Sequence, residues 1–181
     1  MEIRTDRLTL RQARQSDLAD VNEFMSHAKA MRYWSTPPHR DIAQTALWLQ
    51  NMIEAPAKIS ANFLIEFEGR AIGEVGAFPL PEFGFILHPA YWRRGFGFEA
   101  ASAAIHHIFE TRVIDTLLAD VDPRNDSSVS LLAKLGFRKT GEAQRTFCVG
   151  GEWVDSLYFR LNRGDITNGA NIAAIVAPCA R

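Results

Sequence analysis

The sequence contains little cysteine and no long apolar run. Only Cys148 and Cys179 occur among its 181 residues, so it cannot build a disulfide framework, and we expect two unrelated thiols in a reducing compartment. No segment approaches the roughly 18 consecutive apolar residues of a membrane-spanning helix. The N-terminal Met-Glu-Ile-Arg-Thr-Asp-Arg also lacks the apolar core of a signal peptide. These absences predict a cytoplasmic protein with no membrane partner.

An excess of charge of either sign is also missing. Twenty Lys and Arg residues balance 21 Asp and Glu residues, which leaves a formal net charge of −1. No bulk electrostatic attraction therefore draws the chain to nucleic acid, and we expect no nucleic-acid partner.

The apolar content is sufficient for one ordinary domain, because hydrophobic residues make up 47% of the chain. We expect residues 1–163 to form that domain and residues 164–181 to form a C-terminal tail. The tail contains turn residues and one small apolar cluster, which would allow a homodimer.

Hydrophobic periodicity predicts alternating strands and helices. Strand patterns cover residues 7–12, 63–67, 71–78, 82–88, 115–122, 147–149 and 153–161. Helix patterns cover residues 16–27, 41–54, 99–108 and 126–135. The expected apolar face of the second helix consists of Ile42, Ala46, Leu49 and Ile53.

Caps and short connections refine this pattern. Ser16 or Asp17 is expected to cap the first helix, and Asn125 or Asp126 the last one. Strands 63–67, 71–78 and 82–88 follow one another through very short connections, which predicts antiparallel neighbours. Strand 115–122 instead follows strand 82–88 through a helix, which predicts a parallel pair.

Residues 82–101 carry the most informative stretch. An apolar strand ends near Pro89, and Gly95-Phe96-Gly97 then opens an alanine-rich helix. The first amides of a helix lack internal partners and lie at its positive end, so this junction can bind an anion. The alternative is that the glycines only turn a strand into a helix. No Gly-Lys-Ser/Thr follows, and Gly-x-Gly-x-x-Gly is not matched because position 100 is Ala, although Ala can stand there.

Three blocks occur in one order: Arg4-Thr-Asp-Arg-Leu-Thr-Leu-Arg11, residues 82–100, and Asn125-Asp-Ser-Ser128 followed by Leu132-Ala-Lys-Leu-Gly-Phe137. Together they resemble the GNAT superfamily of acetyl-CoA-dependent N-acetyltransferases, specifically the branch of the ribosomal-protein N-terminal acetyltransferases. The resemblance covers residues 3–162. It implies an α/β (α+β) acyltransferase fold, with a mostly antiparallel mixed sheet, one splayed parallel strand pair and flanking helices.

The resemblance also implies acetyl-CoA as co-substrate, with no metal. Its pantetheine arm would lie along Phe85, Ile86 and Leu87, and Asn125 would contact it from the far side. The pyrophosphate would lie against Arg93, Arg94, Gly95, Phe96, Gly97 and Phe98. Trp92 stands where the family usually has Gln or Arg, which removes one polar contact. Either arginine is expected to reach a phosphate of CoA or to remain solvated.

The implied reaction is direct attack of an amine on the acetyl thioester. The resemblance assigns Ser128 to protonation or positioning of the leaving thiolate; a simple first-turn helix serine is the alternative. Glu82 is expected to take the amine proton through water, and Glu74 is the competing carboxylate.

Other reactive residues do not form a site in the sequence pattern. His106 and His107 are adjacent and would point about 100° apart on a helix, so they are not a metal pair. His27, His39 and His88 are scattered, and no histidine is near Cys148.

The leading acceptor hypothesis is a protein N-terminal α-amine. Its pKa of about 7.7–8.0 requires only about 1 kcal/mol for deprotonation at neutral pH, against nearly 5 kcal/mol for lysine. A small amine, such as an amino acid, a polyamine or an aminoglycoside, is the first alternative, and a non-catalytic CoA-binding protein is the second. Tyr33 and Trp34 are interpreted as core anchors, with walls of the acceptor site as the alternative.

Overall fold

The computed structural model describes residues 1–167 and contains two sheets. The first has the strand order β1-β2-β3-β4-β5, and the second has the order β6-β8-β7. The strands are β1 (Glu2–Arg4), β2 (Thr9–Arg11), β3 (Ala61–Phe67), β4 (Arg70–Ala77), β5 (Phe83–Leu87), β6 (Thr116–Val121), β7 (Arg138–Val149) and β8 (Glu152–Asn162). The helices are α1 (Leu18–Met25), α2 (Ile42–Glu54), α3 (Phe96–Thr111), α4 (Asp126–Lys134) and α5 (Arg163–Thr167), with single 3₁₀ turns η1 (Gln15–Asp17) and η2 (Pro89–Tyr91).

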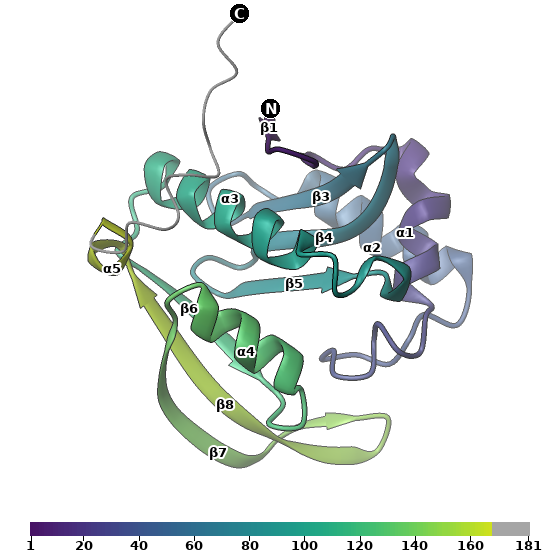
Figure 1. Ribbon diagram of the computed structural model, residues 1–181. Helices are drawn as coiled ribbons and strands as arrows, with labels where there is room; N and C mark the ends of the chain where they lie inside the picture. Colours follow the sequence, from purple (N-terminus) through teal and green to yellow (C-terminus); the bar gives the residue numbers. More distant parts are fainter. Residues whose placement is uncertain (168–181) are drawn as a thin grey trace, which may run out of the picture.

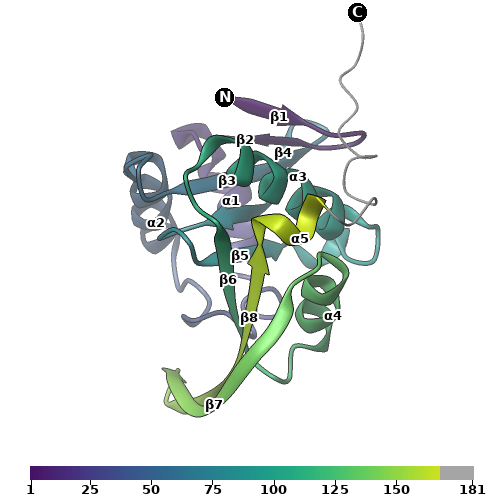
Figure 2. The same ribbon diagram turned by 90° about the vertical axis from the view of Figure 1, so that its left-hand side faces the viewer.

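Helices cover both faces of the five-stranded sheet. Helix α3 lies on one face, and α1 and α2 lie on the other (Figures 1 and 2). Alternate residues of β3 serve the two faces, since Phe63 and Ile65 pack in the α3 cluster and Leu64 packs in the α1–α2 cluster. The sequence of α3 explains its close approach to the sheet, because four of its buried residues are alanines: Ala100, Ala101, Ala103 and Ala104.

Strands β5 and β6 connect the two sheets through one parallel bridge. The bridge pairs Glu82 with Leu118, and the Leu118 amide donates to the Pro81 carbonyl at 3.0 Å. Beyond this point the strands diverge (Figure 1). The expected fold, with one splayed parallel pair in a mostly antiparallel arrangement, is confirmed.

Asp17 occupies the expected cap position of the first helix but does not make the expected capping hydrogen bond. Asp17 makes no side-chain cap for α1. Its carboxylate instead accepts two hydrogen bonds from the Arg11 guanidinium, both at 2.8 Å, and Glu66 binds the same guanidinium at 2.5 Å. Arg11 and Asp17 are both buried, and their ion pair joins β2 to the start of α1.

The expected apolar face of α2 is confirmed at Leu49 and wrong at Ile42 and Ile53. Ile42 and Ile53 are 53% and 37% exposed, whereas Thr45 and Leu49 are buried. Burial of Thr45 is acceptable because its hydroxyl donates to Asn22 Oδ1 at 2.7 Å and lies 2.9 Å from Nδ1 of His39. The face of α2 that turns inward therefore depends on Asn22, 23 residues from Thr45 in sequence, and on His39, six residues away.

The structure contains more strand and helix near the two ends of the described chain than the sequence predicted. Strand β7 begins at Arg138, earlier than expected, and β1 was not anticipated. Helix α5 continues past the expected boundary at residue 163. The apolar cluster proposed for a homodimer, and Cys179, lie outside the described residues. Within residues 1–167, no helix has the length and apolar character needed to cross a membrane.

Breaking the buried ion pair should destabilise the fold. We expect Asp17→Ala to lower the free energy of unfolding by about 3–5 kcal/mol, because it leaves the Arg11 charge buried with only Glu66 as partner. Urea denaturation measures the loss, with the exposed Glu2→Ala, which removes a surface partner of Arg4, as control. Equal losses in the two variants would contradict this role of Asp17.

Candidate functional site

The edge of β5 offers unpaired peptide groups to the gap beside β6. Glu82 accepts a hydrogen bond from the Phe78 amide, and the His88 amide donates to Ile72, so even-numbered residues of this strand pair with β4. Peptide groups alternate in direction along a strand, so those of Phe85 and Leu87 point into the gap. The sequence prediction for these two residues agrees with this geometry. Ile86 differs, because its peptide group pairs with β4 and its side chain is buried beside α1 and α2.

Trp92, which stands where the GNAT resemblance leads us to expect Gln or Arg, makes a hydrogen bond of its own at the gap. Its indole Nε1 donates to the Leu87 carbonyl at 2.7 Å. One of the carbonyls facing the gap is therefore satisfied within the chain, and the Phe85 peptide group and the Leu87 amide remain.

Residues 93–98, the predicted anion cradle, form the loop before α3 and the uncapped start of this helix. Gly95 is the N-cap residue, with φ 81°, and no side chain caps this helix end. Arg93 also has a positive φ, of 59°. Helix α3 therefore begins with backbone amides that point out of the helix without a capping partner. The Phe96 side chain is buried in the core, so Phe96 contributes to the cradle only through its backbone.

Arg7 compensates an acidic residue in this cradle. Glu99 lies in the first turn of α3 and is buried. The Arg7 side chain binds Glu99 Oε2 through Nε at 2.7 Å, and the Arg7 amide donates to Oε1 at 2.9 Å. Arg7 also donates to the Arg94 carbonyl at 2.9 Å. The N-terminal block of the sequence thus braces the loop and neutralises a charge that would repel an anion.

The two arginines of the loop have different surroundings. The Arg94 guanidinium lies over the rings of Phe67, Tyr91 and Phe96, at 5.1, 5.7 and 4.7 Å from their centroids. Arg93 is exposed and makes no hydrogen bond or ion pair with the residues that the structure describes. The N–H donors of both guanidinium groups therefore remain available to a phosphate, and the rings hold that of Arg94 in place.

Helix α4 presents Asn125 and Ser128 at its N-terminus. The Asn125 side chain accepts a hydrogen bond from the Ser128 amide at 3.2 Å, which identifies Asn125 as the cap. Its amide NH₂ remains able to donate. Ser128 is half-buried in the first turn, and within residues 1–167 its hydroxyl has no hydrogen-bond partner.

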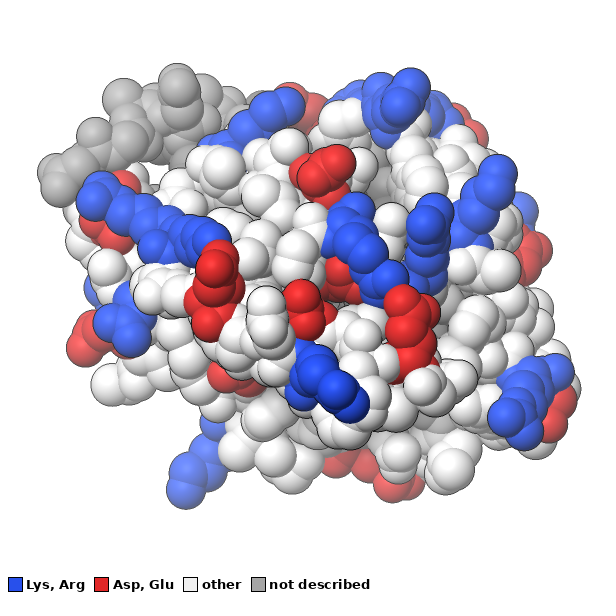
Figure 3. All heavy atoms as spheres, turned by 90° about the horizontal axis from the view of Figure 1, so that it is seen from below, with Lys and Arg blue, Asp and Glu red and all other residues white. Residues whose placement is uncertain are grey.

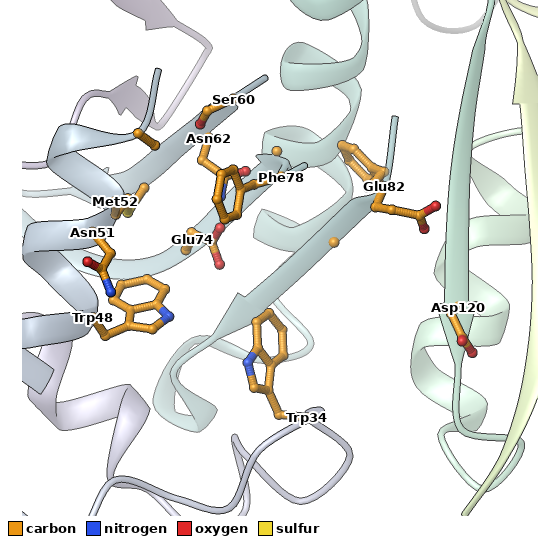
Figure 4. Close-up of a pocket in the computed structure, with 14 residues that line it drawn as sticks. Trp34, Trp48, Asn51, Met52, Ser60, Asn62, Glu74, Phe78, Glu82 and Asp120 are labelled. Carbon is orange, nitrogen blue, oxygen red and sulfur yellow. The ribbon is translucent and has the colours of Figure 1, made fainter. Parts of the chain in front are cut away.

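A cavity of about 370 Å³ opens on the α1–α2 side of the sheet, next to the strand gap. Its floor is a row in register across three strands: Asn62 pairs with Gly76, and Gly76 pairs with Gly84. The two glycines lower this part of the sheet face. The other lining residues are Trp34, Trp48, Asn51, Met52, Ala55, Ser60, Glu74, Phe78, Glu82, Phe83 and Asp120 (Figure 4).

Only carboxylates carry charge in this cavity, which we name the acidic cavity. Glu82, at the start of β5, and Asp120, on β6, lie on facing sides of the gap, and Glu74 projects from β4 (Figure 4). Burial raises the pKa of Glu74 to about 8, and its Oε2 has no hydrogen-bond partner. Burial, followed by the neighbouring Asp120 charge, raises the pKa of Glu82. Burial also raises the pKa of Asp120, and a hydrogen bond from Ser156 lowers it by a smaller amount. The acidic cavity suits a cationic amine.

A second cavity, of about 360 Å³, adjoins the first and shares Trp34 and Asp120 with it. We name it the outer cavity. It lies between the α1–α2 loop and the β7–β8 hairpin, and it contains Arg32 and Arg124 as well as acidic residues. The Arg124 guanidinium binds both Asp122 and Glu152.

The surface charge is mixed on the lower face of the molecule. Basic and acidic side chains are interspersed there, with no field of one sign (Figure 3). On this face, the acidic residues are therefore not part of a wider acidic field.

Trp34 has both of the roles that the sequence left open. It packs against the buried cluster of α1 and α2, and it also lines both cavities. Tyr33 lines the outer cavity, with the Arg32 guanidinium 5.1 Å from its ring centroid.

Sequence reasoning missed Asp120, Asn62, Gly76 and Gly84. Asp120 had one signal, because it is a charge in the middle of an apolar strand pattern. The others had none, since their alignment depends on strand register. The rings of His27 and His88, which the sequence left scattered, lie 5.2 Å apart, and no group of three potential metal ligands occurs among residues 1–167.

Comparisons with known proteins agree on one family. The model described as "Acetyltransferase (GNAT) domain" matches residues 7–138. The spermidine N(1)-acetyltransferase of Escherichia coli K12 is 25% identical over 154 residues, covering 82% of each chain. The [ribosomal protein uS5]-alanine N-acetyltransferase of the same organism is 34% identical over 94 residues, covering 52% of this chain and 48% of that protein. Among solved structures, spermidine N-acetyltransferase from Vibrio cholerae in complex with CoA and spermine has a TM-score of 0.76 at 21% identity, covering 90% of this chain and 99% of that one.

The pKa of Glu74 predicts a pH-dependent stability. Between its ordinary pKa of 4.5 and its folded pKa of about 8, the unfolded chain has lost this proton and the folded chain retains it. The free energy of unfolding should therefore fall as the pH rises through this range, by up to about 1.4 kcal/mol per pH unit relative to Glu74→Gln. Urea denaturation at pH 5, 6, 7 and 8 measures the difference, with Glu68→Gln, exposed in the turn between β3 and β4, as control. Parallel pH profiles for wild type and Glu74→Gln would contradict the assignment.

Proposed function

The chain belongs to the acetyltransferase (GNAT) family, and from this premise we propose that it acetylates the N-terminal α-amine of a protein. The observation that carries this proposal is the junction of the acidic cavity, the outer cavity and the strand gap at Asp120. An acceptor peptide would place its terminal amine at this junction. Its first side chain would enter the acidic cavity, and the following residues would leave through the outer cavity.

The cofactor side of the site fits acetyl-CoA. The Phe85 peptide group and the Leu87 amide point into the gap and match the amides of a pantetheine arm. The uncapped N-terminus of α3 suits a pyrophosphate, and Arg93 is available for a further phosphate. The Asn125 amide group would contact the arm from α4.

Acetyl-CoA supplies a thioester whose carbonyl carbon accepts the amine lone pair and whose sulfur leaves as a thiolate. Glu82 and Asp120 hold the incoming ammonium group and take its proton, directly or through water. Their raised pKa values bring them closer to neutral pH, as a proton acceptor requires. Glu74 is one strand further from the gap, which favours Glu82 over Glu74 as the base. The Ser128 hydroxyl positions the leaving thiolate by a hydrogen bond or passes it a proton, and solvent water then restores the proton to the serine.

A small polycationic amine is the second candidate acceptor. Glu82 and Asp120 line the acidic cavity with no basic residue beside them, and the charge of these two carboxylates favours a polycation. The similarity to spermidine N(1)-acetyltransferase supports the same candidate. The low pKa of an α-amine favours the first candidate, since the site offers carboxylates and water and no stronger base.

Thiol release from acetyl-CoA tests the proposal. The acceptors are peptides with a free N-terminus, N-terminally blocked peptides that contain lysine, and spermidine. We expect turnover with the free N-termini, and we expect Ser128→Ala and Glu82→Gln each to lower kcat by about 10²-fold or more. Ser130→Ala, exposed on the same helix, is the matched control.

Two other outcomes would each support a different function. Turnover with spermidine alone would replace the N-terminal acceptor with the polyamine. Binding of acetyl-CoA without turnover of any amine would indicate a non-catalytic CoA-binding protein.

The compensation of Glu99 by Arg7 predicts a charge effect on CoA binding. Arg7→Ala should raise the Kd for CoA about tenfold or more, because it leaves a carboxylate uncompensated beside the phosphates. The double variant Arg7→Ala/Glu99→Gln should recover part of the loss. Isothermal titration calorimetry measures both. An equal loss in the single and double variants would show that Arg7 acts only as a brace.

A further inference from the structure

Phe78 is a large aromatic side chain that the fold leaves exposed inside the acidic cavity. Its amide donates to the Glu82 carbonyl at 3.0 Å, and the pair before it in register is Ala77 with Phe83. Phe78 and Glu82 are therefore direct neighbours across the strands, with Cβ atoms about 5 Å apart. The Phe78 side chain lines the cavity and is 50% exposed. An apolar group that covers this ring would remove its area from water, which favours binding.

The floor beside Phe78 consists of glycine at two paired strand positions. Gly84 pairs with Gly76, and a Cβ on Gly76 would lie 2.2 Å from the Ala61 carbonyl oxygen, so close packing explains that glycine. A Cβ on Gly84 would meet no atom within 4 Å, and Gly84 does not have a positive φ. The fold therefore does not require glycine at position 84, and the space over it belongs to the acidic cavity.

Aromatic rings also cover this cavity from the α1–α2 side. Trp48 projects from α2, and Trp34 projects from the loop after α1 (Figure 4). The charge of the cavity is confined to the gap, where Glu82 and Asp120 lie on facing sides. Glu74 largely keeps its proton at neutral pH, because burial raises its pKa to about 8. The cavity thus offers carboxylates to an ammonium group at the gap, and aromatic walls beyond it.

The strand register brings these walls within reach of a side chain on the acceptor. The parallel bridge pairs Glu82 with Leu118, so Asp120 faces Gly84 across the gap two residues further on. An amine held between Glu82 and Asp120 therefore lies beside Gly84. Neighbouring strands are about 4.8 Å apart, and about four non-hydrogen atoms span this distance. A side chain of that length crosses Gly84 and contacts Phe78.

We propose that Phe78, Trp48 and Gly84 form an apolar specificity subsite, which takes a long, flexible apolar side chain, such as that of methionine or leucine, on the carbon that bears the reacting amine. Phe78 and Trp48 contact this side chain, and Gly84 leaves room for it. A first residue of glycine or serine leaves the rings exposed to water. A lysine side chain brings a second ammonium group to walls that carry no charge. This inference rests on the proposed function, since it assumes that the amine reacts at the strand gap.

Four variants separate this subsite from the rest of the acceptor site. Phe78→Ala removes the ring beside Glu82, Phe78→Leu retains an apolar wall, and Gly84→Val fills the floor. Phe147→Ala is the matched control, because Phe147 is 43% exposed and lines the outer cavity but not the acidic cavity. Urea denaturation checks that each variant folds.

The acceptors are peptides that differ only in a first residue of Met, Leu, Ser, Gly or Lys, and kcat/KM is measured by thiol release. In wild type we expect Met and Leu to exceed Ser, Gly and Lys by about tenfold or more, because a large apolar side chain leaves water. Phe78→Ala and Gly84→Val should each lower the ratio of Met to Gly about tenfold. Phe78→Leu should retain most of this ratio, and Phe147→Ala should leave it unchanged.

Binding of the amino-acid amides in the presence of CoA, measured by calorimetry, separates this inference from the proposed function. Tighter binding of methionine amide than of glycine amide, lost in Phe78→Ala, with no turnover of any amine would support the subsite and overturn the transferase proposal. Turnover with the same ratio of Met to Gly in wild type, Phe78→Ala and Gly84→Val would overturn the subsite and leave the transferase proposal intact. Faster turnover of the Lys peptide than of the Met peptide, or an equal change of the ratio in Phe147→Ala, would also overturn the subsite.

Discussion

Strands β5 and β6 share one parallel bridge, between Glu82 and Leu118, and then separate. Beyond the bridge, β5 has peptide groups that no strand completes, and such groups are costly unless water, a side chain or a ligand satisfies them. The Trp92 indole satisfies the Leu87 carbonyl, and the Phe85 peptide group remains open to the gap. The cofactor side and the acceptor side of the site both depend on this separation, because the gap is the place where the two sides meet.

On the cofactor side, Arg7 compensates the negative charge of Glu99 in helix α3. A bare helix N-terminus attracts an anion, yet Glu99 occupies the first turn of α3. Arg7 resolves this conflict by binding the Glu99 carboxylate and the Arg94 carbonyl together. The connection between β1 and β2, far from the loop in sequence, therefore affects both its shape and its electrostatic character.

On the acceptor side, the acidic cavity contains a glycine that packing does not require, Gly84, and a buried carboxyl oxygen without a hydrogen-bond partner among the described residues, Oε2 of Glu74. Close packing explains the glycine at position 76 and does not explain the one at position 84. Burial alone would favour an apolar residue at Glu74. Of these two departures from ordinary packing, a binding role accounts for Gly84, because this glycine forms the floor of the cavity beside Glu82.

The sequence by itself determined the features that depend on residues close together in the chain. The glycine loop before α3 and the Asn125 cap of α4 were predictable, because a cap or a turn involves only neighbouring residues. The inward face of α2 was not, since burial of Thr45 depends on partners in α1 and the loop after it. The acidic cavity was not predictable either, because Gly84 and Asp120 come from separate strands. Only strand register and the divergence of β5 from β6 place them around one space, and both arise from pairing and packing over the whole chain.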